Sequence, residues 1–314
     1  MEKITDTSPL NTLSAAPGFR SGFVTFIGRP NAGKSTLLNA LTGTKLAITS
    51  DTPQTTRHRF RAILDGEDYQ LILVDTPGIH KPHDSLGEEL NYSALQALQS
   101  VDAVAFLLDA TREFGKGDLW ILEQLKGLRC PLILVVSKTD KATPEQVEAQ
   151  IEAATAIRNF DVICALSAVS GEGLERFKNK LLTLLPEGPR WFPAGMRTDQ
   201  DLSVLIAEFI REKVLYLTRD EVPHAVGVEV EEISYDKKKD IHLINAMIFV
   251  ERDSQKGILI GKGGEKIKEI GTSARNDLAQ LLASRVYLDL RVKVRKNWRR
   301  DINQIRRFGY GQGN

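Results

Sequence analysis

The chain has 314 residues, of which 42% are hydrophobic and 26% are charged, and its formal net charge is +1. These values are typical of a soluble globular protein of two ordinary-sized domains, and they exclude a chain that is polybasic along its whole length. No apolar run approaches the ~18 residues of a membrane-spanning helix. The two cysteines stand in no metal-binding spacing, so we expect a cytoplasmic protein.

The first half of the chain is patterned as an α/β domain. Segment 1–20 is polar and lacks an apolar signal core, which predicts a disordered tail. Between residues 21 and 185, helical patterns alternate with the apolar runs "GFVTFIG", "YQLILVD", "AVAFLLD", "PLILVVS" and "DVICALS". Continuously apolar runs are typical of strands that are covered on both faces. The region therefore predicts an α/β domain with a mainly parallel sheet and crossover helices.

A phosphate-binding loop follows the first of these runs. The segment "GRPNAGKST" matches G-x-x-x-x-G-K-[ST], in which glycines let backbone N–H groups converge on phosphate oxygens. We expect Lys34 to reach the β- and γ-phosphates and Ser35 to coordinate Mg²⁺. The predicted nucleotide contacts here are Gly28, Arg29, Pro30, Asn31, Ala32, Gly33, Lys34, Ser35 and Thr36.

Two further segments complete the predicted phosphate site. "DTPG" ends the second run, where Asp75 would hold the Mg²⁺ shell and the Gly78 N–H would sense the γ-phosphate. The polar segment "SDTPQTTRHRF" lies before it, and we choose Thr56 as a Mg²⁺ ligand, with Thr55 as the alternative. The contacts predicted around "DTPG" are Asp75, Thr76, Pro77, Gly78 and Ile79.

The residues after "DTPG" predict slow chemistry and a mobile segment. Many proteins that hydrolyse nucleotides with such loops carry a water-orienting glutamine where this chain has Ile79, so we expect slow intrinsic hydrolysis. His80 and His83 form an H-x-x-H pattern without further ligands, which favours a mobile switch over a transition-metal site.

A base-recognition loop is predicted at "SKTD". The Asp140 carboxylate can accept hydrogen bonds from two N–H donors of guanine, and the Lys138 stem can cover the base. Ser137 stands where this loop normally carries an asparagine that contacts the base and braces the phosphate loop, so we expect weaker affinity with the guanine preference kept. Backbone N–H groups of "LSA" would meet the guanine carbonyl oxygen. The predicted contacts are Ser137, Lys138, Thr139, Asp140, Ser167 and Ala168.

The second half of the chain is patterned differently. Segment 186–200 lies in the proline-rich "LLPEGPRWFP" region and is predicted as a linker. Residues 201–314 then show an amphipathic helix, two alternating strands, a second helix and a third strand with a basic face, which predict a smaller α+β domain.

This second domain carries a predicted RNA site. Glycines in "GILIGKGGEKIKEIG" allow close approach of a sugar-phosphate backbone. Residues 261–307 hold thirteen Lys or Arg against five Asp or Glu, a net +8 in a chain whose total is +1. Trp298 would either stack on a base or pack in the core. The predicted RNA contacts are Gly261, Lys262, Gly263, Gly264, Lys266, Lys293, Arg295, Lys296, Trp298 and Arg299.

The motifs "GRPNAGKST", "QTTRHR", "DTPGIHKP", "SKTD" and "LSA" together resemble those of the Era family of GTPases, and the second domain resembles a KH domain in the prokaryotic arrangement. The resemblance implies GTP and GDP as ligands with Mg²⁺, the 3′ end of small-subunit ribosomal RNA as partner, a role in 30S subunit maturation, and peripheral contact with the inner membrane. It also implies potassium stimulation, with the ion bound partly by Asn31. We expect a monomer. The residues predicted to act in hydrolysis are Asn31, Lys34, Thr56, Asp75 and Gly78.

Two other classes of protein remain open at this point. A P-loop ATPase with an RNA-binding appendage would prefer ATP, and Asp140 argues against it. An RNA-binding scaffold with a degenerate nucleotide site is favoured by Ser137 and Ile79, whereas the intact Lys34 and Asp75 argue against it.

Overall fold

The computed structural model describes residues 16–50, 52, 55–78 and 84–310. Within these residues, the chain divides into two compact units. The first unit contains residues 16–47, 59–78 and 94–199, and the second contains the described parts of 48–58 and 81–93 together with 200–310. Each unit is therefore built from segments that are separated in the sequence.

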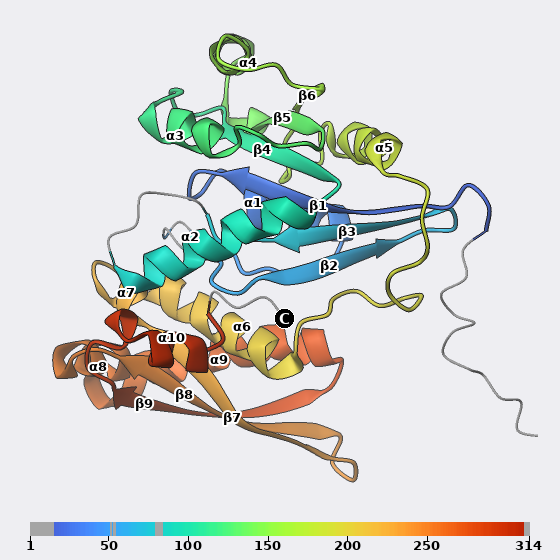
Figure 1. Ribbon diagram of the computed structural model, residues 1–314. Helices are drawn as coiled ribbons and strands as arrows, with labels where there is room; N and C mark the ends of the chain where they lie inside the picture. Colours follow the sequence, from blue (N-terminus) through green and yellow to red (C-terminus); the bar gives the residue numbers. More distant parts are fainter. Residues whose placement is uncertain (1–15, 51, 53–54, 79–83, 311–314) are drawn as a thin grey trace, which may run out of the picture. The chain divides into compact units, whose positions relative to one another are not determined.

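The first unit is built on a six-stranded sheet (Figure 1). Its order is β2-β3-β1-β4-β5-β6, and every neighbouring pair is parallel except β2 and β3. This arrangement confirms the predicted P-loop NTPase fold with its mainly parallel sheet. The strands are β1 (Arg20–Gly28), β2 (Phe60–Asp65), β3 (Tyr69–Asp75), β4 (Ala103–Asp109), β5 (Leu132–Ser137) and β6 (Val162–Ala165).

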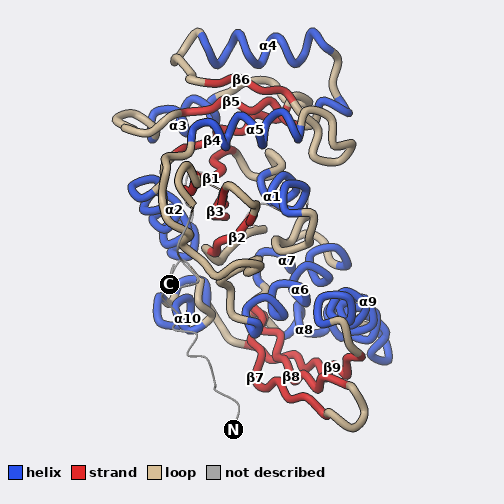
Figure 2. The backbone as a smooth tube through the Cα atoms, turned by 90° about the vertical axis from the view of Figure 1, so that its right-hand side faces the viewer, coloured by secondary structure: helices blue, strands red, loops and turns tan. Residues whose placement is uncertain are grey.

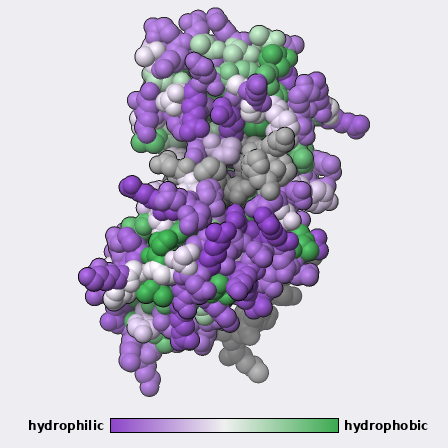
Figure 3. Space-filling model, turned by 90° about the vertical axis from the view of Figure 1, so that its left-hand side faces the viewer, coloured by the Kyte–Doolittle hydropathy of each residue, from purple (hydrophilic) through white to green (hydrophobic). Residues whose placement is uncertain are grey.

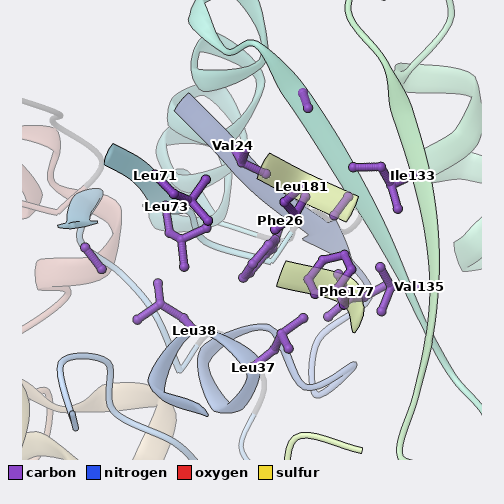
Figure 4. Close-up of a cluster of buried hydrophobic side chains, with 14 of the residues drawn as sticks. Val24, Phe26, Leu37, Leu38, Leu71, Leu73, Ile133, Val135, Phe177 and Leu181 are labelled. Carbon is purple, nitrogen blue, oxygen red and sulfur yellow. The ribbon is translucent and has the colours of Figure 1, made fainter. Parts of the chain in front are cut away.

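Helices cover both faces of this sheet. Helices α1 and α5 pack on one face, where Phe26 and Phe177 lie among the apolar side chains drawn in Figure 4. Helices α3 and α4 and the end of α2 contribute to a separate apolar cluster with residues of β4 and β5. The helices are α1 (Lys34–Thr42), α2 (Ser85–Ala97), η2 (Leu98–Ser100), α3 (Lys116–Gln124), η3 (Thr139–Lys141), α4 (Pro144–Thr155) and α5 (Leu174–Leu184).

The segment predicted as a linker, 186–200, is bound along the first unit for most of its length. The Gln70 side-chain oxygen accepts from the backbone N–H groups of Trp191 and Phe192 at 2.8 and 2.9 Å. Arg190 forms an ion pair with Asp65. Residues up to 199 therefore belong to the first unit, because main-chain and charged contacts hold this proline-rich segment to the β2–β3 hairpin.

The second unit contains a three-stranded sheet with helices on one face (Figures 1 and 2). In the order β7-β8-β9, the first pair is antiparallel and the second pair is parallel. Helices α6 and α9 pack against each other and against the sheet. The final strand follows the helices, which confirms the predicted KH-type fold. The elements are α6 (Leu202–Leu217), α7 (Val222–Ala225), β7 (Gly227–Asp236), β8 (Ile241–Val250), α8 (Asp253–Ile260), η4 (Lys262–Gly264), α9 (Glu265–Leu282), β9 (Arg285–Val294), η5 (Trp298–Arg300) and α10 (Ile302–Arg307).

A second apolar cluster of this unit joins its C-terminal end to the start of α2. The members are Leu86, Leu90, Phe249, Trp298, Ile305, Phe308 and Tyr310. No helix in the described part of the chain has both the length and the apolar character needed to cross a membrane. On the face drawn in Figure 3, hydrophilic residues predominate and the apolar ones form small patches.

Candidate functional site

The phosphate loop lies between β1 and α1. Gly28 must be glycine, because an added Cβ would lie 2.6 Å from the Leu107 carbonyl oxygen. Gly33 precedes α1 with a φ of 93° and has no side chain to cap the helix. The Lys34 ammonium is buried and donates to the carbonyl oxygens of Gly28 and Arg29, both at 3.1 Å. The loop thus combines a lysine ammonium with a helix N-terminus, two features that favour the binding of an anion.

Asp75 and Gly78 lie beside this loop. Strands β1 and β3 are parallel neighbours, so their carboxyl ends meet at one edge of the sheet, and Asp75 there is fully buried. Burial lowers the pKa of Lys34 to about 8, and the Asp75 charge opposes that shift. A Cβ on Gly78 would lie 3.2 Å from the Lys34 ammonium, which brings "DTPG" against the phosphate loop as predicted. Ile79, His80 and His83 lie outside the described residues.

Ser137 ends β5 and braces the phosphate loop despite its short side chain. Its buried hydroxyl lies 2.8 Å from the carbonyl oxygen of Ala32 and 2.9 Å from that of Leu108, and these two acceptors share its single O–H. The sequence predicts this brace for asparagine, and the structure shows that serine also makes it. The phosphate loop is therefore still supported although position 137 carries serine in place of asparagine.

Asp140 and Ser167 are also brought together. The Ser167 hydroxyl donates to an Asp140 carboxylate oxygen at 2.6 Å and accepts from the backbone N–H of Ser170 at 3.1 Å. The backbone N–H of Ser167 donates to the Glu172 carbonyl oxygen at 2.9 Å. The prediction that this N–H meets guanine is therefore wrong, since the 167–172 turn uses it, and Ala168 remains the candidate.

Replacing Ser137 by alanine is expected to weaken nucleotide binding and lower stability. The change removes the donor from two buried carbonyl oxygens, which costs about 1–3 kcal/mol in the free energy of unfolding. We expect GDP affinity to fall several-fold, because the phosphate loop loses its brace. Urea denaturation and titration with a fluorescent GDP measure the two effects.

Thr143→Ala is the matched control for that experiment. Thr143 caps α4 through a bond from the Gln146 N–H, and its loss should lower stability without changing GDP affinity. If Ser137→Ala binds GDP as tightly as the parent, the brace has no role in binding.

The segment that carries Thr55 and Thr56 belongs to the second unit. The Thr55 hydroxyl donates to the Thr52 carbonyl oxygen at 2.6 Å, within a local turn, and the Thr55 carbonyl oxygen accepts a hydrogen bond from Arg211 of α6. Thr56 is buried. The segment is therefore held by its backbone in the α+β unit.

Buried charges surround this segment within the second unit. Arg211 binds Glu208 through two bonds of 2.8 and 2.6 Å, and His58 lies 3.6 Å from the same carboxylate. Arg57 donates to the Val226 carbonyl oxygen at 2.5 Å. Burial lowers the pKa of His58 to about 4 against the opposing effect of Glu208, so this ring is neutral at pH 7. The pattern of polar residues along α6 gave no signal that they would be buried.

The glycine-rich loop of the second unit joins α8 to α9. Gly261 has a φ of 72°, and a Cβ there would lie 2.8 Å from the Lys266 Cβ. Gly263 and Gly264 also have positive φ, and Lys262 is exposed. The loop therefore presents backbone and one cation to solvent, as an RNA-binding loop requires.

The basic residues near the C-terminal end divide into two groups. Lys293 and Lys296 are exposed, whereas Arg295 lies 4.0 Å from the centre of the Phe249 ring and Arg299 pairs with Glu251 at 2.9 Å. Trp298 is fully buried, and its indole N–H donates to the Ala225 carbonyl oxygen at 2.8 Å. The assignment of Trp298 as an RNA contact is wrong, because the ring packs inside the apolar cluster.

The described residues contain no cluster of three or more His, Cys, Asp or Glu side chains suited to hold a metal ion by themselves. Sequence analysis also missed Asp109, whose carboxylate lies 2.6 Å from the Lys138 ammonium. The signal was present, because Asp109 ends an apolar run and carboxyl ends of parallel strands share one edge of the sheet.

Comparison with known proteins matches both halves of the chain. A family model described as 50S ribosome-binding GTPase matches residues 23–138, and a KH-domain model matches residues 221–299. The curated protein GTPase Era of Mycolicibacterium smegmatis is 48% identical over 296 residues, which cover 93% of this chain and 99% of that protein.

Two solved structures are similar over the same extent. One is Era in complex with MgGDPNP and nucleotides 1506–1542 of 16S ribosomal RNA, and the other is a single-residue variant of Aquifex aeolicus Era bound to GDP and AlF4⁻. Each has a TM-score of 0.89 and 39% sequence identity, and each match covers 93% of this chain and 99% of that chain.

Proposed function

The chain belongs to the Era family of GTPases, and on that premise we propose a switch in which the nucleotide bound by the first unit controls RNA binding by the second. It is a GTP-hydrolysing protein with a KH domain, and it binds small-subunit ribosomal RNA. We extend this to the 3′ end of that RNA and to assistance in 30S subunit maturation.

The observation that carries the nucleotide part is the meeting of three loops at one edge of the sheet. Lys34 supplies positive charge to the phosphates, Gly78 lies against that ammonium, and the Ser137 hydroxyl ties the base loop to the phosphate loop. The brace weakens one of the two arguments for a degenerate scaffold, namely the serine at position 137. Asp140, held by Ser167, favours guanine over adenine.

The residues of the first unit fit a magnesium-bound nucleotide. Asp75 is a fully buried carboxylate, and the Lys34 ammonium near it is also buried. Because a buried carboxylate is costly unless cations compensate its charge, a divalent ion bound beside Asp75 would be stabilised. Ser35 and Asp75 would hold Mg²⁺, and Thr56 is the proposed third ligand. When bound, the ion neutralises charge on the β- and γ-phosphates. The protein groups orient the nucleotide and exclude water from Lys34.

The coupling part rests on the division of the chain. The described residues of 48–58 precede the "DTPG" motif in sequence and carry Thr56, yet they belong to the unit that holds the glycine-rich loop. A ligand shifts an equilibrium between two states only through its different affinities for them. We infer that a γ-phosphate acting on Thr56 changes the contacts of this segment and thereby the RNA affinity.

Binding measurements test both parts. Fluorescent GDP bound to the full chain is displaced with GTP, ATP and xanthosine triphosphate. The affinity for a single-stranded RNA with the 3′-terminal sequence of 16S ribosomal RNA is then measured with GDP, with a GTP analogue and without nucleotide. We expect displacement by GTP but not ATP, and different RNA affinities in the three states. Equal RNA affinities would contradict the switch, and displacement by ATP would contradict the base assignment.

Potassium stimulation is a separate proposal, supported by Ile79 in place of a water-orienting glutamine and by Asn31 in the phosphate loop. Replacing Asn31 by alanine should abolish the increase in GTP hydrolysis that potassium gives the parent, while GDP affinity stays nearly unchanged. Phosphate release in potassium and in sodium buffer at equal ionic strength measures it. Equal potassium responses of variant and parent would rule the site out. The monomeric state and peripheral membrane contact stay predictions.

A further inference from the structure

The end of β4 supports the base loop at three adjacent residues. The Leu108 carbonyl oxygen accepts from the Ser137 hydroxyl at 2.9 Å, and the Ala110 N–H donates to the Ser137 carbonyl oxygen at 3.0 Å. Between them, an Asp109 carboxylate oxygen lies 2.6 Å from the Lys138 ammonium. Residues 137 and 138 are thus fixed by one short stretch of a neighbouring strand.

Asp109 is built to hold that ammonium. Its side chain is 8% exposed, and its other carboxylate oxygen accepts from the Thr111 N–H at 3.0 Å and from the Thr111 hydroxyl at 2.6 Å. Arg112 is more distant, at 3.6 Å. Although burial raises it, the hydrogen bonds from Lys138 and Thr111 lower the pKa of Asp109 below its ordinary value, so the group is charged at neutral pH.

Lys138 is consequently fixed at both ends. Its backbone has a φ of 61°, its ammonium is held by Asp109, and its side chain is 30% exposed. A lysine that is free in solution loses much rotamer freedom when a ligand packs on its stem. The Lys138 side chain has already lost this rotamer freedom before a base binds. The stem between its two fixed ends is the surface on which the base can pack.

We propose that Asp109 is a positioning residue of the guanine site, which holds Lys138 so that the lysine stem covers the base. The assignment rests on the proposed nucleotide function of the first unit. Asp109 acts through Lys138 and does not touch the base.

The test is a double-mutant cycle on GDP affinity in the full chain, measured with a fluorescent GDP. Asp109→Asn keeps an acceptor for Thr111 and removes the charge, and it should weaken binding by about tenfold. Lys138→Met should weaken binding by at least as much, because the stem is kept without its anchor. The double variant should bind no more weakly than Lys138→Met alone. At saturating GTP, the kcat of Asp109→Asn should equal that of the parent, with KM raised.

Asp102→Asn is the matched control, because Asp102 precedes β4 at its other end and accepts from the Phe23 N–H at 2.7 Å. It should lower the melting temperature and leave GDP affinity unchanged. If Asp109→Asn behaves in the same way, or if the effects of the two changes at 109 and 138 multiply, Asp109 has only a structural role. If the parent itself fails to bind GDP, the proposed function falls as well, so the two failures are distinguishable.

Discussion

Replacing Asp140 by asparagine is expected to lower GDP affinity by about two to three orders of magnitude and to make xanthosine diphosphate the better ligand. Guanine offers two N–H donors to the two oxygens of the Asp140 carboxylate. An asparagine side chain keeps one acceptor oxygen and has an NH₂ donor in place of the other. Xanthine has a carbonyl oxygen where guanine has its amino group, so it suits the amide. Titration of parent and variant with both fluorescent diphosphates measures the change.

Asp161→Asn serves as the control for this exchange. Asp161 accepts from the Leu132 N–H at 2.8 Å at the start of β5, away from the edge where the loops meet. Its loss should leave the base preference as in the parent. If Asp140→Asn still prefers GDP, another residue chooses the base and the interpretation of "SKTD" as a guanine loop is wrong.

Replacing Arg211 by methionine is expected to destabilise the second unit by about 3–5 kcal/mol. Arg211 is fully buried, and its loss removes both hydrogen bonds that it donates to the desolvated Glu208 carboxylate. That carboxylate then keeps only the attraction of the Arg57 cation, beside a neutral His58 ring. The Thr55 carbonyl oxygen loses its donor as well. We therefore expect earlier unfolding in urea and a reduced difference in RNA affinity between the GDP and GTP-analogue states. GDP affinity should change little, because the groups that hold the base lie in the first unit.

The double variant Glu208→Gln with Arg211→Met separates charge from packing. Removing both charges of a buried pair is often close to neutral, whereas removing one is costly. The double variant should recover most of the lost stability but not the bond to Thr55. If it is as unstable as Arg211→Met alone, the uncompensated carboxylate is not the cause of the instability.

The fold was predictable where local pattern and burial agree. Strands β3, β4 and β5 are buried along almost their whole length and read as continuous apolar runs. Strand β2 was missed, because "FRAILD" follows a polar segment and pairs antiparallel with β3 at the edge of the sheet. Its existence depends on the hairpin at Gly66, which the spacing of apolar residues does not show.

The candidate site was predictable where a function depends on backbone N–H groups or on the spacing of residues within a motif. The structure places the phosphate loop, Asp75 and the start of the base loop at the carboxyl ends of β1, β3 and β5. The roles of these residues in nucleotide binding stay predictions. The errors concern side chains whose partners are distant in sequence. Trp298 lies in a basic stretch, yet the rings of Phe308 and Tyr310 enclose it. Likewise, the polar face of α6 reads as solvated, but residues 55–58 cover Glu208 and Arg211.

The interleaved division of the chain sets an order on its synthesis. Thr55 and Arg211 are 156 positions apart, so at 5–20 residues per second the ribosome needs roughly 8–30 s to make the second after the first. Throughout that interval, the described residues of 48–58 have been translated, but α6, whose Arg211 binds Thr55, is not yet complete. A nascent chain that ends at residue 199 already contains every strand of the first sheet, but Ile48, Leu86 and Leu90 still lack their apolar partners. The apolar cluster that contains Leu86 and Leu90 is therefore complete only when α10, the last described helix, has left the ribosome.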